Sequence, residues 1–287
     1  MLARLAARPR LLTATGVSAL GLGLDFALTP AKQLRSISSP SAASIGSVEL
    51  YQYEICPFCN KLKALLDLHR VPYATTEVNP LTKGEIKSWS GGYRKVPITL
   101  LAGEQINDSP VIASALMDSM GRAGVLGEAE LAAFRSPEAL RWAEWSDKQF
   151  AVLLFPNITR SFSESYEAFG YVMDVPHFSM ADKWANQLVG SFFMWMAQGK
   201  IKKKYAIDNE REAVVNGINK WMGEGVGAGP FAGGATPNFA DVCVFGCLKA
   251  IDRTTAWSEI MAETSVAPWY GRMREAVEPG NACTSRQ

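Results

Sequence analysis

Residues 48–59 read Val-Glu-Leu-Tyr-Gln-Tyr-Glu-Ile-Cys-Pro-Phe-Cys, and this stretch is the most informative about the fold. Its first half alternates as a β-strand does, and it stops at two cysteines, Cys56 and Cys59, with two residues between them. Leu62, Leu65 and Leu66 follow at helical spacing. The stretch therefore predicts a strand that delivers Cys56 to a turn and a helix that begins there.

The cysteine pair suits thiol chemistry. Unpaired N–H groups and the dipole at a helix N-terminus favour the thiolate of Cys56, the form that acts as nucleophile. Cys59, one turn further on, can resolve a mixed disulfide. Half a zinc site is the weaker alternative, because only His69 and His177 are available and no second Cys-x-x-Cys pair completes four ligands. His69, at the end of the predicted helix, is interpreted as a surface residue and not as a catalytic base.

The pattern after this helix continues the same domain. It predicts a strand at 73–78, a helix at 83–89, an apolar strand at 95–101 with a possible edge strand after it, and a helix from Asp108. Pro97 lies inside the apolar strand, where proline is normally excluded unless the position is exceptional, such as a cis peptide bond beside a site. The order is β-α-β-α-β-β-α.

Asp108 and Ser109 open the last of these helices. Asp108 is an N-cap candidate, and the pair offers a carboxylate, a hydroxyl and free N–H groups at one place. This supply suits the γ-glutamyl end of glutathione, with Ser109 and the N–H groups facing its carboxylate and Asp108 its ammonium. A plain helix cap is the alternative interpretation.

Beyond about residue 136, long amphipathic stretches rich in tryptophan predict an all-helical half. Asn238 and Asp241 predict a capped helix start, because Asp241 can reach back to the cap. Cys243 and Cys247 fall on this helix, which is apolar nearly all round, and are interpreted as packing residues. The lysines of 200–204 are interpreted as the solvated end of a helix.

Charge sets the first 45 residues apart from the rest. They hold five basic groups and one acid, whereas the remainder has 24 basic and 27 acidic residues, a net charge of −3. This part of the chain lacks the surplus of clustered Lys and Arg that binding to nucleic-acid phosphates requires. The Arg-, Ser- and Ala-rich start resembles an organelle transit segment, for mitochondrion or plastid. The alternative is weak membrane association through residues 11–28, whose apolar stretch is short of the roughly 20 residues that span a bilayer.

These patterns predict an α/β plus all-α protein, in which a thioredoxin-like domain precedes an all-helical domain like the C-terminal half of glutathione transferases. The predicted divisions are a targeting segment and linker at 1–45, a thioredoxin-like glutathione-binding domain at 46–122, a linker at 123–135, a helical domain at 136–280 and a tail at 281–287.

The motifs taken together resemble the microsomal prostaglandin E synthase type 2 family of the glutathione-transferase superfamily. The similar motifs are Tyr51-Gln52-Tyr53, Cys56-Pro57-Phe58-Cys59, Val78-Asn79-Pro80, Tyr93-Arg94-Lys95-Val96-Pro97-Ile98, Asn107-Asp108-Ser109, Phe155-Pro156-Asn157, Pro237-Asn238-Phe239-Ala240-Asp241 and Pro268-Trp269-Tyr270. They fall in the expected order and cover roughly Val48 to Ala276. Glu54 departs from the animal members, which have a basic residue there, and its charge is expected to work against the Cys56 thiolate.

The resemblance implies isomerisation of prostaglandin H2 to prostaglandin E2 by a thiol, glutathione binding, haem bound together with glutathione, and a homodimer. The implied site residues are Cys56, Cys59 and Tyr53 for catalysis, Tyr53 and Phe58 for the substrate, and Cys56, Phe58, Val96, Pro97, Asp108 and Ser109 for glutathione. The expected partner is a small molecule, either a lipid endoperoxide or a mixed disulfide. Two alternatives stay open: a glutaredoxin-like thiol-disulfide oxidoreductase, and a non-catalytic protein that binds glutathione or haem.

Overall fold

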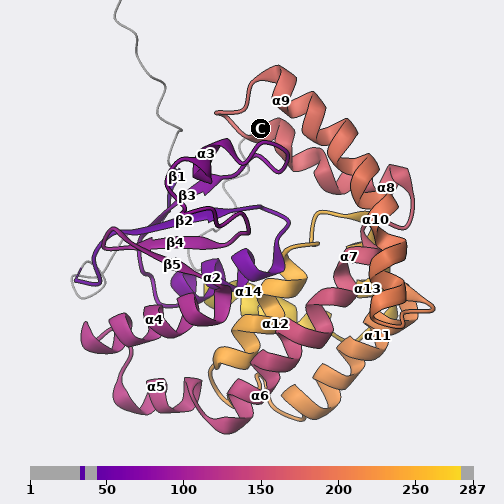
Figure 1. Ribbon diagram of the computed structural model, residues 1–287. Helices are drawn as coiled ribbons and strands as arrows, with labels where there is room; N and C mark the ends of the chain where they lie inside the picture. Colours follow the sequence, from indigo (N-terminus) through magenta and orange to yellow (C-terminus); the bar gives the residue numbers. More distant parts are fainter. Residues whose placement is uncertain (1–32, 36–43, 279–287) are drawn as a thin grey trace, which may run out of the picture.

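The computed structural model describes residues 33–35 and 44–278 (Figure 1). The predicted transit segment and residues 11–28 lie outside the described residues. Within the described part of the chain, no helix is both long and apolar enough to cross a membrane.

The N-terminal half is a mixed sheet flanked by helices (Figure 1). Its five strands run in the order β1-β3-β2-β4-β5. Their bounds are β1 Gln33–Arg35, β2 Val48–Gln52, β3 Tyr73–Glu77, β4 Ile98–Leu101 and β5 Glu104–Asn107. Among the strands that the structure describes, only β2 and β3 are parallel, and the crossover between them is α2, Pro57–Leu68.

Alternate residues of β2 serve the two faces of the sheet. Leu50 joins the main core, to which α2 and α4 (Ser109–Arg122) also contribute. Tyr51, on the other face, packs in a smaller cluster with Ile86 of α3 (Gly84–Lys87). The period-2 pattern of the sequence therefore corresponds to a strand covered on both sides.

The structure corrects two of the predicted divisions. Residues 1–45 were expected to lie outside the fold, but β1 pairs antiparallel with β3 and Ile45 belongs to the core. A short edge strand is held by main-chain hydrogen bonds and needs no side-chain pattern, so the sequence gives no sign of it. The expected linker at 123–135 contains α5, Glu128–Phe134, whose Phe134 is buried.

The C-terminal half is helical, as predicted. Its elements are α6 Pro137–Trp145, η1 Ser146–Phe150, α7 Ala151–Asn157, α8 Phe162–Ala168, η2 Phe169–Asp174, α9 Met180–Ala185, η3 Asn186–Gly190, α10 Ser191–Lys204, α11 Glu210–Lys220, η4 Trp221–Val226, α12 Phe239–Lys249, α13 Thr255–Glu263 and α14 Ala267–Val277. The capping box at Asn238 and Asp241 is confirmed, with both of its reciprocal hydrogen bonds present. Cys243 and Cys247 are buried packing residues, as expected.

The two halves meet where α12 crosses α2. A Cβ atom on Gly246 would lie 2.4 Å from the main-chain N and Cα of Lys61, so the helices touch backbone to backbone. The Lys61 side chain is buried and pairs with Asp147 of η1 at 2.7 Å. The helix that begins at the dithiol is therefore fixed by the helical half.

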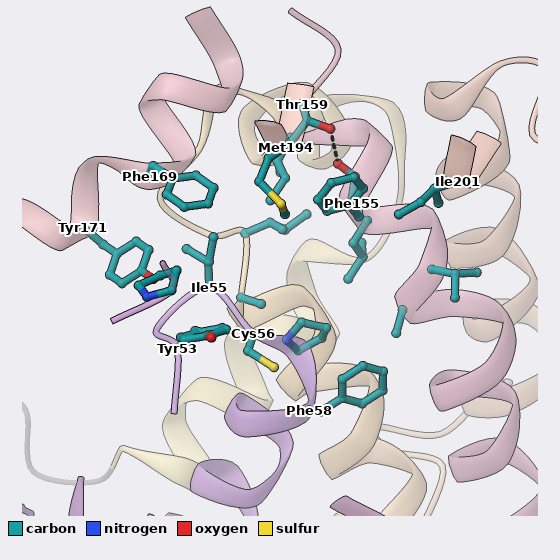
Figure 2. A pocket seen from close by; sticks show the side chains of 18 of the residues that line it. Tyr53, Ile55, Cys56, Phe58, Phe155, Thr159, Phe169, Tyr171, Met194 and Ile201 are labelled. Carbon is teal, nitrogen blue, oxygen red and sulfur yellow. Dashed lines mark hydrogen bonds between the residues drawn. The ribbon is translucent and has the colours of Figure 1, made fainter. Parts of the chain in front are cut away.

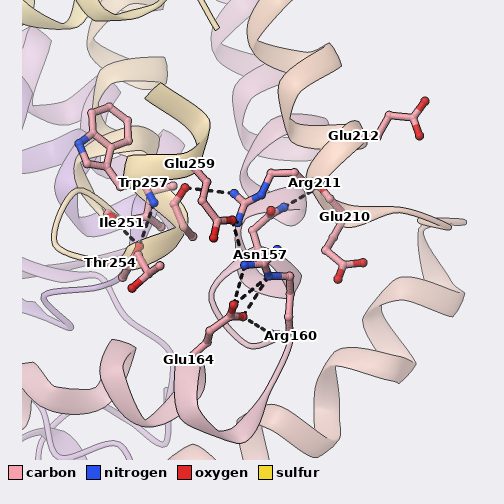
Figure 3. Close-up of polar contacts among 12 residues, drawn as sticks. Asn157, Arg160, Glu164, Glu210, Arg211, Glu212, Ile251, Thr254, Trp257 and Glu259 are labelled. Atoms are coloured by element: carbon pink, nitrogen blue, oxygen red, sulfur yellow. Dashed lines mark hydrogen bonds and ion pairs between the residues drawn. The ribbon is translucent and has the colours of Figure 1, made fainter. Parts of the chain in front are cut away.

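A polar network holds the end of α7 in place (Figure 3). Arg160 and Arg211 both pair with Glu259 of α13, at 3.0 and 2.6 Å. The side-chain amide of Asn157 donates to the carbonyl of Glu210 at 2.7 Å. This network anchors the segment that carries Phe155 and Thr159, which line the cavity described next.

Candidate active site

Cys56 occupies the N-cap position of α2, immediately before Pro57. Its N–H donates to the carbonyl of Tyr53 at 3.0 Å, and its own carbonyl accepts from the Asn60 side chain at 3.1 Å. Cys56 is half-buried, whereas Cys59 is 0% exposed. The loop thus presents one thiol and shelters the other.

The two thiols are electrostatically distinct. A hydrogen bond from the Cys59 side chain lowers the pKa of Cys56, against the opposing effect of burial. Main-chain N–H groups of Cys59 and Phe58 and the charge of Lys63 act in the same direction as Cys59. Burial raises the pKa of Cys59 well above its ordinary value. Cys56 is therefore the thiol suited to be the nucleophile.

The expected opposition from Glu54 does not prevail, since the pKa of Cys56 is lowered even with this acid two residues away. A Glu54 carboxylate oxygen pairs with the Lys63 ammonium at 2.9 Å and accepts from the Gln52 amide at 3.0 Å. A carboxylate whose charge is met by a cation projects little field onto its neighbour. The pairing partner lies nine residues along the chain, on α2.

Sequence reasoning missed a buried acid beneath the dithiol loop. Glu77 ends β3 opposite Gln52, and its carboxyl accepts from the Gln52 amide at 3.2 Å and from the N–H of Glu54 at 2.9 Å. Burial raises its pKa to about 8. The Tyr171 hydroxyl is buried without a well-formed hydrogen bond, but it lies within electrostatic reach of Glu77 and Cys56. The signal available in the sequence was a charged residue at the end of a largely buried strand.

An apolar cavity of about 450 Å³ opens beside Cys56 (Figure 2). Its lining includes Tyr53, Ile55, Cys56 and Phe58 from the dithiol side, Lys83 from the turn after β3, and Phe155, Ile158, Phe169, Tyr171, Met194 and Ile201 from the helical half. Figure 2 shows Phe155, Phe169 and Met194 on the side opposite the dithiol loop. The sequence did not predict the lining residues of α10 and η2, because these side chains come to face one cavity only when the helices pack together.

A second, more polar cavity of about 720 Å³ lies on the other side of Phe58, which lines both. Its lining includes four of the residues predicted to bind glutathione: Val96, Pro97, Asp108 and Ser109. It also includes Tyr93, Lys95, Arg135 and Glu144. Cys56, by contrast, lines the apolar cavity only. The Val96–Pro97 peptide bond is cis, as predicted.

Asp108 is at the N-cap position of α4, but its side chain does not cap the helix. Its backbone has φ of 66°, and its carboxylate accepts from the Tyr93 hydroxyl at 2.8 Å. The plain-cap interpretation is therefore wrong, because this backbone conformation directs the carboxylate away from the helix and into the cavity.

His69 is not a surface residue. Its side chain is 6% exposed, its ring packs on that of Phe134, and burial lowers its pKa to about 4. It lies at the opposite end of α2 from Cys56 and lines neither cavity.

Comparisons with known proteins agree with this architecture. Residues 48–106 match the glutaredoxin family model. Solved structures with a similar fold include a beta-etherase from a Sphingobium strain, with a TM-score of 0.56 and 16% identity over 80% of this chain and 97% of the other. Human glutathione transferase theta-2 has a TM-score of 0.52 and 13% identity over 81% and 83% of the two chains. The sheet, the helical half and the dithiol at their junction define a thiol protein with the glutathione-transferase fold.

Closer relatives identify the family. The chain is 31% identical to prostaglandin E synthase 2 of Mus musculus, over 94% of this chain and 82% of the mouse protein. It is also 31% identical to prostaglandin E synthase 2 of Danio rerio, over 80% and 71% of the two chains. The chain belongs to the prostaglandin E synthase 2 family.

Proposed function

We propose that this protein is a glutathione-dependent thiol isomerase that converts prostaglandin H2 to prostaglandin E2. The observation that carries the proposal is the position of Cys56. A thiol whose pKa is lowered lies on the wall of an apolar cavity, and Phe58 connects this cavity to a polar one. An apolar cavity suits a lipid endoperoxide, and the relatives at 31% identity take their name from this reaction.

The polar cavity fits glutathione, a tripeptide with two carboxylates and an ammonium. Lys95 supplies positive charge, and Asp108 supplies the negative group for the ammonium. The first turn of α4 has no side-chain cap, so the N–H groups of Ser109 and Val111 are available to a carboxylate, while Pro110 between them has none. The main chain of Val96 would pair with the tripeptide backbone. Bound there, glutathione would bring a second thiol to the region of Phe58, the residue that lines both cavities.

The proposed reaction begins with attack of the Cys56 thiolate on one peroxide oxygen. An S–O bond forms, the O–O bond breaks, and the other oxygen leaves as an alkoxide that takes a proton. The carbon attached to the sulfur-bound oxygen then loses its proton, the C=O bond forms, and the S–O electron pair returns to the sulfur. Among the titratable side chains of the cavity wall, Tyr171 is the one with the Glu77 carboxyl beside it, and it would exchange these protons.

The remaining features implied by the resemblance are part of the proposal. The exposed apolar side chains of Phe193 and Met196 on α10 favour a homodimer. For haem, the apolar walls of the cavity suit a porphyrin. The described residues of the lining include no histidine, so Cys56 and Met194 are the lining residues whose sulfur atoms would bind the iron. The composition of the N-terminus supports an organelle location in mitochondrion or plastid.

The test is turnover of prostaglandin H2 by the purified protein with and without glutathione. We expect prostaglandin E2 above the spontaneous level, and an absorption spectrum of the same sample reports any haem. Formation of no prostaglandin E2 above the level in buffer would refute the isomerase proposal.

A second candidate function is reduction of glutathione mixed disulfides. It is favoured by Cys59, which is buried directly behind Cys56, shares a hydrogen bond with it and has a raised pKa. This is the arrangement of a resolving thiol, whereas the isomerisation needs only one sulfur. Disulfide reduction without isomerisation would select this alternative.

Glutathione binding can be tested through Asp108 without any turnover. We expect Asp108→Asn to weaken glutathione binding about tenfold or more, because the ammonium loses a charged partner. Asparagine keeps an acceptor for the Tyr93 hydroxyl, so thermal stability should not change. Calorimetry of the reduced protein measures the affinity, with Asp208→Asn, at an exposed position, as the control. Equal affinities in the two variants would remove Asp108 from the binding site.

A further inference from the structure

Apart from the Cys56 thiolate, Lys83 is the one charged side chain among the described residues that line the apolar cavity. Its ammonium lies 4.5 Å from the centroid of the Tyr53 ring. The acid that influences it most, Glu85, is held elsewhere by the N–H of Asn79 at 2.8 Å and by His177 at 3.6 Å. Within the described residues, Lys83 has no ion-pair partner.

A turn fixes the backbone of Lys83. The Asn79 side-chain carbonyl accepts from the N–H groups of Leu81 and Thr82, at 3.0 and 3.1 Å. The N–H of Lys83 donates to the Asn79 carbonyl at 2.9 Å, and Asn79 is itself buried. The lysine therefore starts from a rigid position at the entrance to α3, and its reach into the cavity is set by the fold.

The ammonium remains charged at neutral pH. Burial, with a further contribution from Arg94, lowers the pKa of Lys83 to about 8, which is still above 7. A half-buried cation beside apolar walls is unfavourable until an anion joins it. The cavity offers this anion a place next to Lys83 and offers its hydrocarbon chain the side chains of Phe155, Phe169 and Met194.

We propose that Lys83 is the carboxylate anchor of the apolar cavity and that it selects long-chain carboxylic acids over neutral lipids. This inference rests on the proposed function in that it names the substrate class of the same cavity. The cation fixes one end of the molecule, and the walls, being apolar, accept the rest without specific hydrogen bonds. Lys83 is thus a specificity residue, separate from the thiol chemistry of Cys56.

The experiment compares binding of dodecanoate and of dodecanol to the full chain by calorimetry, below the concentrations at which either aggregates. We expect wild type to prefer the acid, and Lys83→Met to lose about 10- to 100-fold in affinity for the acid, while its affinity for the alcohol changes less than about threefold. Lys83→Arg should keep the preference. Lys87→Met, on the exposed side of the same short helix, is the matched control and should bind like wild type.

Two results would overturn the inference: equal affinity of wild type for the acid and the alcohol, or equal losses in the Lys83→Met and Lys87→Met variants. If Lys83→Met loses affinity for both ligands, its cavity is damaged, and Lys83→Arg becomes the deciding variant. A Lys83→Arg protein that still prefers the acid supports the anchor, and one that has lost this preference contradicts it. No turnover is measured, so selective binding by a protein that fails to convert prostaglandin H2 would refute the proposed reaction and leave the carboxylate site standing.

Discussion

Replacing Cys56 by serine is expected to reduce both prostaglandin H2 turnover and disulfide reduction to the uncatalysed background. A serine hydroxyl has no appreciable anion near neutral pH, whereas the Cys59 hydrogen bond and the Lys63 charge favour the Cys56 thiolate. The fold should be unaffected, because the two side chains differ little in size and Cys56 is only half-buried. Steady-state assays measure the first effect and thermal unfolding the second.

Cys59→Ser is the informative comparison. It should keep any one-thiol reaction, and it should accumulate a glutathione mixed disulfide on Cys56, which mass spectrometry of the intact protein detects. Alkylation of the reduced wild-type protein should label Cys56 first, since burial raises the pKa of Cys59 and shields it. First labelling at Cys59, or loss of all activity in Cys59→Ser alone, would reverse the two roles.

The second large effect is expected on stability, from a residue that is far from Cys56 in the sequence. Gly246→Ala is expected to destabilise the protein by about 1–3 kcal/mol, although alanine favours a helix, because its Cβ would meet the main chain of Lys61 at 2.4 Å. Backbone cannot yield as a flexible side chain does, so α12 must move away from α2. Urea unfolding measures the loss, and a raised pKa of Cys56 in alkylation experiments would show the displacement of α2.

Gly199→Ala is the matched control for this prediction. Gly199 is also inside a helix, α10, but its Cβ would meet no atom within 4 Å. This substitution should therefore stabilise the protein by about 0.5–1 kcal/mol through helix propensity. If both variants unfolded at the same urea concentration, the close approach of α12 and α2 would not contribute to stability.

Features that depend on neighbours along the chain could be predicted from the sequence. The strand, turn and helix around Cys56, the cis bond at Pro97 and the capping box at Asn238 are each specified within a few residues, and the structure contains all three. Local chemistry is sufficient there, because a strand period, a proline or a cap acts through atoms that the chain itself brings together. The family resemblance depends on these same motifs.

Which side chains lie together in space could be learned only from the folded structure. The charge of Glu54 is met by Lys63, nearly two turns into the helix, and that of the buried Lys61 by Asp147, 86 residues away. Tyr171 and Met194 complete a cavity wall that no pattern in the sequence predicts. Lys83 becomes notable only because that wall, apart from the Cys56 thiolate, is uncharged. Such contacts join distant segments, and the free energy that selects them belongs to the packed core as a whole, so no short stretch of sequence specifies them.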